Sequence, residues 1–161
     1  MKMTNAGKKF LTELEGVKNH MYYDSKGYAT IGIGHLIDMV TESHLMTKIL
    51  TNEEIYELLD KDLQTYEDCV QETCGSAVYS AYKNDALVSI CYNIGKAGFR
   101  SSTFAKRINA MESDDRIVAA IMQWTADWEL HGRRTVEARL FKEGNYYTGD
   151  KGTVDWAYLK G

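Results

Sequence analysis

The sequence predicts a mostly helical α+β protein, in which one long helix joins a small lobe with a β-hairpin to a larger helical lobe, with a cleft between them. Apolar residues recur at helical spacing along most of the 161 residues. The period changes once, in YYDSKGYATIGIGH at 22–35, where Tyr, Ile and Thr flank a D-S-K-G turn, as in a β-hairpin. A T-x-x-E capping box at Thr51 and Glu54 then begins an apolar stripe that continues to about residue 73.

Each remaining element follows from its own local signal. The first helix ends near Glu15, because Gly16 is a helix-stopping residue. The long helix is about 33 Å long at about 1.5 Å per residue, which is more than either lobe needs, so it joins them. The segment DALVSICYNIG at 85–95 is apolar on nearly every face, which predicts a central buried helix. Further helices are expected at 103–111, 115–125 and 133–141, followed by Gly144, with Trp156, Tyr158 and Leu159 packed on the core.

No proline, repeat or long linker divides the chain, so we expect a single domain over residues 1–161. Its small lobe takes up about 16–60, and its helical lobe about 74–161 together with the first helix.

The composition excludes several classes of protein. With 44% hydrophobic and 26% charged residues, the chain is not a disordered tail. No stretch approaches the ~20 apolar residues of a transmembrane helix. The start, MKMTNAGKKFLTELEG, has no apolar run, so we expect neither a signal peptide nor a membrane anchor. The net charge of -4 argues against a nucleic-acid-binding protein. A basic cluster is either a solvated surface or a contact for an anionic polymer: Lys96, Arg100, Lys106 and Arg107.

The cysteines and histidines indicate no metal site. Cys69, Cys74 and Cys91 cannot all pair within one chain, and none has C-x-x-C spacing, so free thiols are expected. The four histidines show no metal-ligand spacing such as H-E-x-x-H.

Two carboxyl groups and a hydroxyl group form the candidate site. Glu15 ends a helix, where the partial negative charge of the helix dipole disfavours ionisation, as a general acid requires. Asp24 lies at the hairpin turn, where water favours its ionised form. Thr30 follows on the return strand, nearly opposite Asp24, where its hydroxyl can orient a water molecule. Two carboxyls in different environments indicate glycoside hydrolysis, although a helix-end Glu and a turn Asp are also common in proteins without such a site.

A wider pattern surrounds these residues. The spacing E-x8-D-x5-T and the run TIGIGHL resemble the phage lysozyme family, glycoside hydrolase family 24, whose members are phage endolysins. The likeness continues through DALVSICYNIGKAGFRSSTF, QWTADW and GRRTVEARLF, and covers roughly residues 10–145. The resemblance implies a lysozyme-like fold and an N-acetylmuramidase without metal or cofactor. Such an enzyme hydrolyses the β-1,4 bond between N-acetylmuramic acid and N-acetylglucosamine in peptidoglycan, for lysis of the host cell.

The resemblance also implies roles for individual residues. Glu15 matches the catalytic acid, Asp24 the second catalytic carboxyl, and Thr30 the residue that holds the attacking water. Because a threonine hydroxyl beside Asp24 has no evident role in direct attack on the sugar, we predict an inverting mechanism. A lytic transglycosylase, which needs no water-activating Asp, and a non-catalytic peptidoglycan-binding or structural component remain as alternatives.

Further residues match the walls of the sugar cleft. Gly34 and Leu36 match its upper wall, and Tyr92 and Ser102 its lower wall, although packing in the core explains Tyr92 equally well.

Three more residues are expected to support the site. Arg133 aligns with an arginine that pairs with the catalytic glutamate, and Arg134 is the alternative if the register slips by one. His35 and Asp62 match an ion pair of the family.

The resemblance further implies how the enzyme reaches its substrate. We expect a monomer in the host cytoplasm that reaches the periplasm and cell wall after a separate membrane-pore protein, a holin, opens a route. Peptidoglycan is the expected partner, the holin is not stably bound, and neither nucleic acid nor a membrane anchor is expected.

Overall fold

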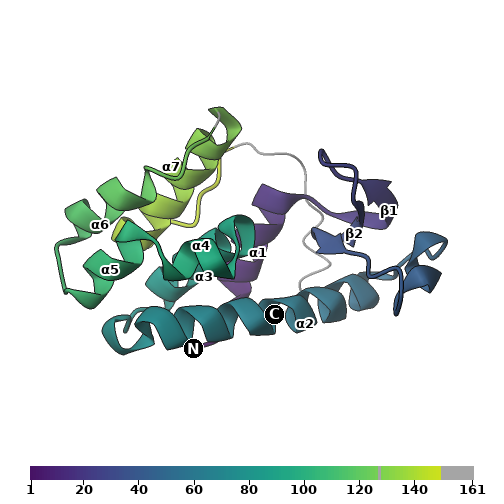
Figure 1. Ribbon diagram of the computed structural model, residues 1–161, viewed down its shortest axis with the longest axis horizontal. Coiled ribbons are helices and arrows are strands. Elements are labelled where there is room, and N and C mark those ends of the chain that lie inside the picture. Colours follow the sequence, from purple (N-terminus) through teal and green to yellow (C-terminus); the bar gives the residue numbers. More distant parts are fainter. Residues whose placement is uncertain (127, 150–161) are drawn as a thin grey trace.

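The computed structural model describes residues 1–126 and 128–149, and these form two lobes above one long helix. Helix α2 (Asn52–Cys74) runs along the whole lower edge of Figure 1, from the strands at one end to the helices of the large lobe at the other. The predicted mostly helical α+β architecture is therefore confirmed. Trp156, Tyr158 and Leu159 lie outside the described residues.

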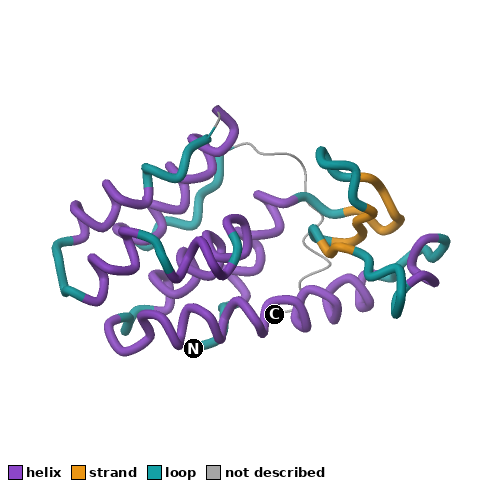
Figure 2. Tube along the Cα trace, viewed as in Figure 1, coloured by secondary structure: helices purple, strands orange, loops and turns teal. Residues whose placement is uncertain are grey.

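The small lobe contains a three-stranded antiparallel sheet, shown in orange in Figure 2. Strand β1 (Lys18–Tyr23) pairs with β2 (Ala29–Gly32), which pairs with β3 (His35–Leu36). The predicted hairpin turn is present, since the Gly27 amide donates to the Asp24 carbonyl at 2.9 Å. Gly27 has φ of +84°, a conformation that glycine adopts without strain. The third strand was not predicted, because two residues carry no detectable period.

Both helices that frame the small lobe begin at capping side chains. In α1 (Asn5–Glu15), the Thr4 hydroxyl accepts from the Gly7 amide, and Gly16 follows with φ of +79°. In α2 both hydrogen bonds of the predicted capping box between Thr51 and Glu54 are formed. A short 3-10 helix, η1 (Ser43–Met46), lies between the sheet and α2.

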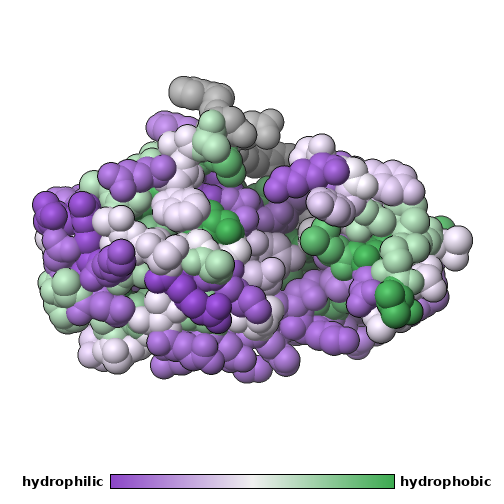
Figure 3. Space-filling view, viewed as in Figure 1, coloured by the Kyte–Doolittle hydropathy of each residue, from purple (hydrophilic) through white to green (hydrophobic). Residues whose placement is uncertain are grey.

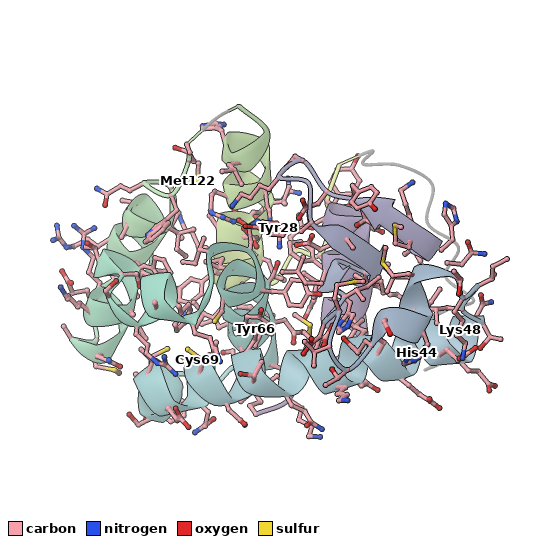
Figure 4. All side chains as sticks on the ribbon, turned by 45° about the vertical axis from the view of Figure 1, so that its right-hand side comes forward. Tyr28, His44, Lys48, Tyr66, Cys69 and Met122 are labelled. Carbon is pink, nitrogen blue, oxygen red and sulfur yellow. The ribbon has the colours of Figure 1, made fainter. Side chains whose placement is uncertain are left out.

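Helix α2 has one face against the protein and one face in water. Its buried residues include Ile55, Leu59, Leu63 and Val70, which recur at intervals of four or seven. Hydrophilic side chains cover the lower edge of Figure 3, where the other face lies. In Figure 4, Tyr66 and Cys69 mark the side of α2 that faces the large lobe.

The large lobe is built around helix α3 (Ala81–Ile94), which packs against α1, α2 and α7. Its residues 84–91 are all buried, as predicted for a central helix. Around it lie α4 (Lys96–Arg100), α5 (Thr103–Asn109), α6 (Asp114–Ile121) and α7 (Trp128–Glu143). A 3-10 turn, η2 (Gly75–Ala77), links α2 to this lobe.

Three helix boundaries differ from the predicted ones by four residues or more. Helix α3 begins four residues before 85, and α7 begins five residues before Arg133, because a single turn is too short to show an apolar period. Helix α6 ends at Ile121 instead of 125. Trp124 therefore lies beyond the end of this helix, and its carbonyl accepts a hydrogen bond from Arg134 Nε at 3.0 Å. Helix α4 was not predicted. Within residues 1–126 and 128–149, no helix combines the length and hydropathy needed to span a bilayer.

Candidate active site

Two cavities lie between the lobes, where Figure 3 shows the surface hollowed. One, of about 490 Å³, is lined by Glu15 of α1, by the turn and strand at 34–36, by Asp62 and Tyr66 of α2, and by Tyr92 of α3. The other, of about 780 Å³, extends from the hairpin turn at Ser25 and Lys26 to Trp124, Arg133 and Arg134. Asn93 lines both cavities, so the two form adjoining parts of one cleft.

Glu15 lies at the C-terminal end of α1 with one fifth of its side chain exposed. Its Oε1 accepts a hydrogen bond from Arg133 Nη1 at 2.6 Å, and the Arg133 side chain is 8% exposed. The predicted partner is therefore Arg133, not Arg134. Arg133 lies in the second turn of α7, however, and does not open that helix as the sequence suggested.

Asp24 is held by the backbone of its own turn. Its Oδ1 accepts from the amides of Lys26 at 2.9 Å and Tyr28 at 2.8 Å. Thr30 is 2% exposed, and its hydroxyl donates to the Tyr28 carbonyl at 2.9 Å. Thr30 faces Tyr22 across the hairpin, so Asp24 is a diagonal neighbour of Thr30 instead of the nearly opposite residue that the sequence suggested.

Tyr22 lies close enough to both candidate carboxyls for their charges to act on its phenol. Burial raises the pKa of its phenol, and the negative charges of Glu15 and Asp24 raise it further. The pKa of the Tyr22 phenol therefore depends on the charges of both carboxyls, although the sequence analysis did not select this residue. Its position two residues before Asp24 on the same strand face was the available signal.

Gly34 brings the backbone of the small lobe against the Glu15 carboxyl. A methyl group on Gly34 would lie 3.4 Å from Glu15 Oε2 and 3.6 Å from the Tyr92 hydroxyl, and the residue has φ of +74°. Leu36 also lines the smaller cavity and is 56% exposed. Both residues are thus placed where the upper wall was expected.

Tyr92 both lines the cavity and packs in the interior. Its hydroxyl donates to the Ile33 carbonyl at 2.5 Å, and its ring lies 5.0 Å from that of Tyr66. Burial, the Glu15 charge and the Asp62 charge all raise the pKa of this phenol. Lining of the cleft and packing in the core are therefore compatible interpretations of Tyr92, because the same side chain lines the cavity and hydrogen-bonds the small lobe.

Ser102 does not line either cavity. It is 2% exposed at the N-cap of α5, where its hydroxyl accepts from the Ala105 amide at 3.1 Å and donates to the Phe99 carbonyl at 2.7 Å. Its hydrogen bonds hold it in the cap, and its assignment to the lower wall stays a prediction.

His35 lies between two carboxylates. Its Nδ1 is 2.7 Å from Asp62 Oδ2, which is the expected pair, and its Nε2 is 2.9 Å from Glu42 Oε1. Burial alone would lower the pKa of His35, but the hydrogen bonds to Asp62 and Glu42 outweigh it, so the pKa is raised. The imidazole thus links β3, α2 and the loop before η1.

A buried ion network extends from Glu15 into the large lobe. Glu137, which is fully buried, accepts from Arg133 Nε at 3.3 Å and from the Ser89 hydroxyl at 2.6 Å. Its other oxygen accepts from Arg134 Nη1. Among residues 1–126 and 128–149, no group of three or more His, Cys, Asp or Glu side chains is arranged to hold a metal ion.

Comparison with known proteins agrees with this architecture. The model of the phage lysozyme family matches residues 12–139. The chain belongs to the phage lysozyme family. The endolysin of Salmonella phage P22 is 34% identical over 109 residues, which are 68% of this chain and 74% of that relative. The endolysin of Bacillus phage PZA is 28% identical over 161 residues, which cover 95% of this chain but 60% of the relative.

Solved structures show the same fold. A crystal structure of a P22 lysozyme variant matches this phage lysozyme with a TM-score of 0.74 and 31% identity, covering 88% of this chain and 98% of that one. The muramidase domain of SpmX from Asticaccaulis excentricus matches with a TM-score of 0.75 and 28% identity, covering 87% and 97%. The protein is accordingly a lysozyme-type glycoside hydrolase, as predicted.

Two residues of this lysozyme that contact predicted site residues were missed from the sequence. Glu137 follows Arg133 by four residues and Arg134 by three, so all three side chains lie on one face of the helix. That spacing was the available signal in the sequence. Glu42 comes from an irregular loop between β3 and α2, so no periodicity marks it.

Proposed function

We propose that this phage lysozyme hydrolyses the β-1,4 bond between N-acetylmuramic acid and N-acetylglucosamine with inversion of configuration, Glu15 acting as the general acid. The observation that carries this proposal is the Glu15 carboxyl at the wall of the inter-lobe cavity. Its Oε1 is bound to Arg133 at 2.6 Å, while its Oε2 faces Gly34. Oε2 is thus the oxygen that carries the proton to the departing glycosidic oxygen.

In the same proposal, Asp24 and Thr30 hold the attacking water. Both backbone donors of the turn bind Oδ1 of Asp24, so Oδ2 is assigned to accept the proton of the water. The Thr30 hydroxyl donates to the Tyr28 carbonyl, which directs its lone pairs to accept from the water. A water held at both groups requires a carboxyl separation of about 6.5–9.5 Å, as in inverting glycosidases, in contrast to about 5–5.5 Å in retaining ones.

The experiment is proton NMR of the first product released from peptidoglycan. We expect the α-anomer, no covalent sugar adduct, and complete loss of activity in Glu15→Gln, because an amide cannot donate an acidic proton. A β-anomer would refute inversion. An anhydro-sugar product would identify a lytic transglycosylase. If the turbidity of permeabilised cells does not fall when the protein is added, the protein is a non-catalytic component.

The delivery route stays a prediction of the family resemblance. A single-domain monomer is proposed to reach the wall only when a separate holin opens the membrane. Expression in a bacterial host should leave cells intact until a holin is co-expressed, and rapid lysis by the enzyme alone would contradict this route.

A further inference from the structure

Two arginine side chains approach the carboxyl that is proposed to donate a proton. Arg133 binds Glu15 at 2.6 Å, and Arg134, the next residue, is fully buried and donates to Asn93 and to the Trp124 carbonyl. Positive charges close to a carboxyl favour its ionised form, typically by 1–3 pH units when they lie within about 4–6 Å. A general acid at Glu15 therefore requires a nearby negative charge to offset them.

Glu137 supplies that negative charge. It contacts both arginines, through Oε2 to Arg133 Nε at 3.3 Å and through Oε1 to Arg134 Nη1, and the Ser89 hydroxyl fixes Oε2 at 2.6 Å. The side chain is fully buried, so water screens these contacts very little. The guanidinium of Arg133 is held by Glu15, by Glu137 and by the Ser89 carbonyl at 3.1 Å, which fixes its orientation.

We propose that Glu137 is a positioning residue for the reaction, whose carboxylate holds Arg133 against Glu15 and offsets the positive charge of Arg134. This inference rests on the proposed general-acid role of Glu15. When Glu15 is ionised, the two carboxylates and the two guanidinium groups make a network of zero net charge. Replacing either Glu137 or Arg134 by a neutral residue changes the net charge of this network by one unit.

Three phenols lie close enough to Glu15 for its charge to act on them. They come from three different elements: Tyr22 of β1, Tyr66 of α2 and Tyr92 of α3. Burial raises the pKa of each phenol, and the charges of Asp24 and Asp62 add to this effect at the nearer ones. All three phenols are therefore neutral at the pH of the reaction. The charged groups Asp24, Lys61 and Asp62 also lie around the cleft, and they stay the same in every variant of the test below.

The test is a charge cycle read out as the pH profile of kcat/KM on peptidoglycan. Glu137→Gln leaves one positive charge in excess, so the alkaline limb should move to lower pH by about one unit. Arg134→Gln leaves one negative charge in excess, so the limb should move to higher pH by a similar amount. The double variant restores neutrality, and its limb should return to the wild-type position. In each variant kcat should change more than KM, because the affected step is proton donation.

Controls separate this proposal from a purely structural role. Lys142→Gln removes a charge from the same helix at an exposed position, with 46% of the side chain in water, and should leave the limb in place. Thermal melts establish that each variant is folded, and if Glu137→Gln does not fold, Arg134→Gln and the double variant carry the test. Limbs that coincide with wild type in folded variants, with Glu15→Gln inactive, overturn the inference. Full activity in Glu15→Gln overturns the proposed function instead.

Discussion

Replacing His35 by asparagine should destabilise the small lobe in a strongly pH-dependent way. The imidazole is within 2.7 Å of Asp62 and 2.9 Å of Glu42, and the three side chains are 14%, 22% and 21% exposed. A hydrogen bond to a charged group contributes about 1.5–3 kcal/mol. Because these pairs are partly exposed and screened, we expect both together to contribute about 2 kcal/mol. For a chain of this size that is about 4–8 °C in Tm.

The sign of the pH dependence follows from the directions of the pKa shifts. The pKa of His35 is raised, so its contribution is complete below the unfolded value of about 6.5 and is lost as pH rises through the folded value. Burial alone would raise the pKa of Glu42, but its hydrogen bonds to the Asp38 amide and to His35 outweigh burial, so the pKa is lowered. The stabilisation that Glu42 contributes is therefore lost only as pH falls through its folded pKa, which lies below the ordinary value of a glutamate. The two contributions therefore coincide between these two folded pKa values.

Urea unfolding at pH 5.5 and pH 9 measures the effect. We expect His35→Asn to lose about 2 kcal/mol at pH 5.5 and much less at pH 9, where a neutral imidazole donates from one nitrogen only. The exposed His44 on η1 provides the matched control, and His44→Asn should change stability by less than about 0.5 kcal/mol at either pH. An equal loss at both pH values for His35→Asn would refute the reasoning.

Three further predictions follow from the site and the core. Arg133→Gln leaves the partly buried Glu15 and the fully buried Glu137 without their shared cation, so unfolding experiments should show a loss of about 3 kcal/mol or more, together with greatly reduced turnover in a turbidity assay. Gly34→Ala should cost about 1–2 kcal/mol in stability because of its φ of +74°, and its methyl group beside Glu15 Oε2 should lower kcat. The three cysteines are at most 1% exposed, and burial raises the pKa of Cys74 to about 12. A thiol reagent should therefore label none of them in the native protein and all three after denaturation.

The parts of the fold that could be predicted are those with local signals. The end of α1 at Glu15, the hairpin turn before Gly27 and the capping box at Thr51 each depend on residues within four positions of one another. The third strand, helix α4 and the first turn of α7 carry no such signal, because two to five residues are too few to show a period.

The contacts of the site that cross from one element to another came from the resemblance to the family, because no local spacing fixes them. The expected Glu15–Arg133 contact is present, and it came from alignment with the family rather than from the residues themselves. The resemblance assigned Ser102 to the lower wall, and that assignment stays a prediction. The structure shows its hydroxyl hydrogen-bonded at the N-cap of α5.

The proposed acid is held by one contact within the large lobe and by one contact between the two lobes. Arg133 reaches Glu15 across 118 residues of sequence, and Tyr92 of the large lobe binds the Ile33 carbonyl of the small lobe across 59. The hydrogen bond from Tyr92 fixes the turn that carries Gly34 against Glu15 Oε2, while Arg133 fixes Oε1. Each oxygen of the carboxyl therefore depends on a different long-range contact. An unfolded or partly folded chain cannot assemble this acid, so hydrolytic activity is coupled to the docking of the two lobes, and the width of the cleft at Glu15 is set by the same residues that stabilise their interface.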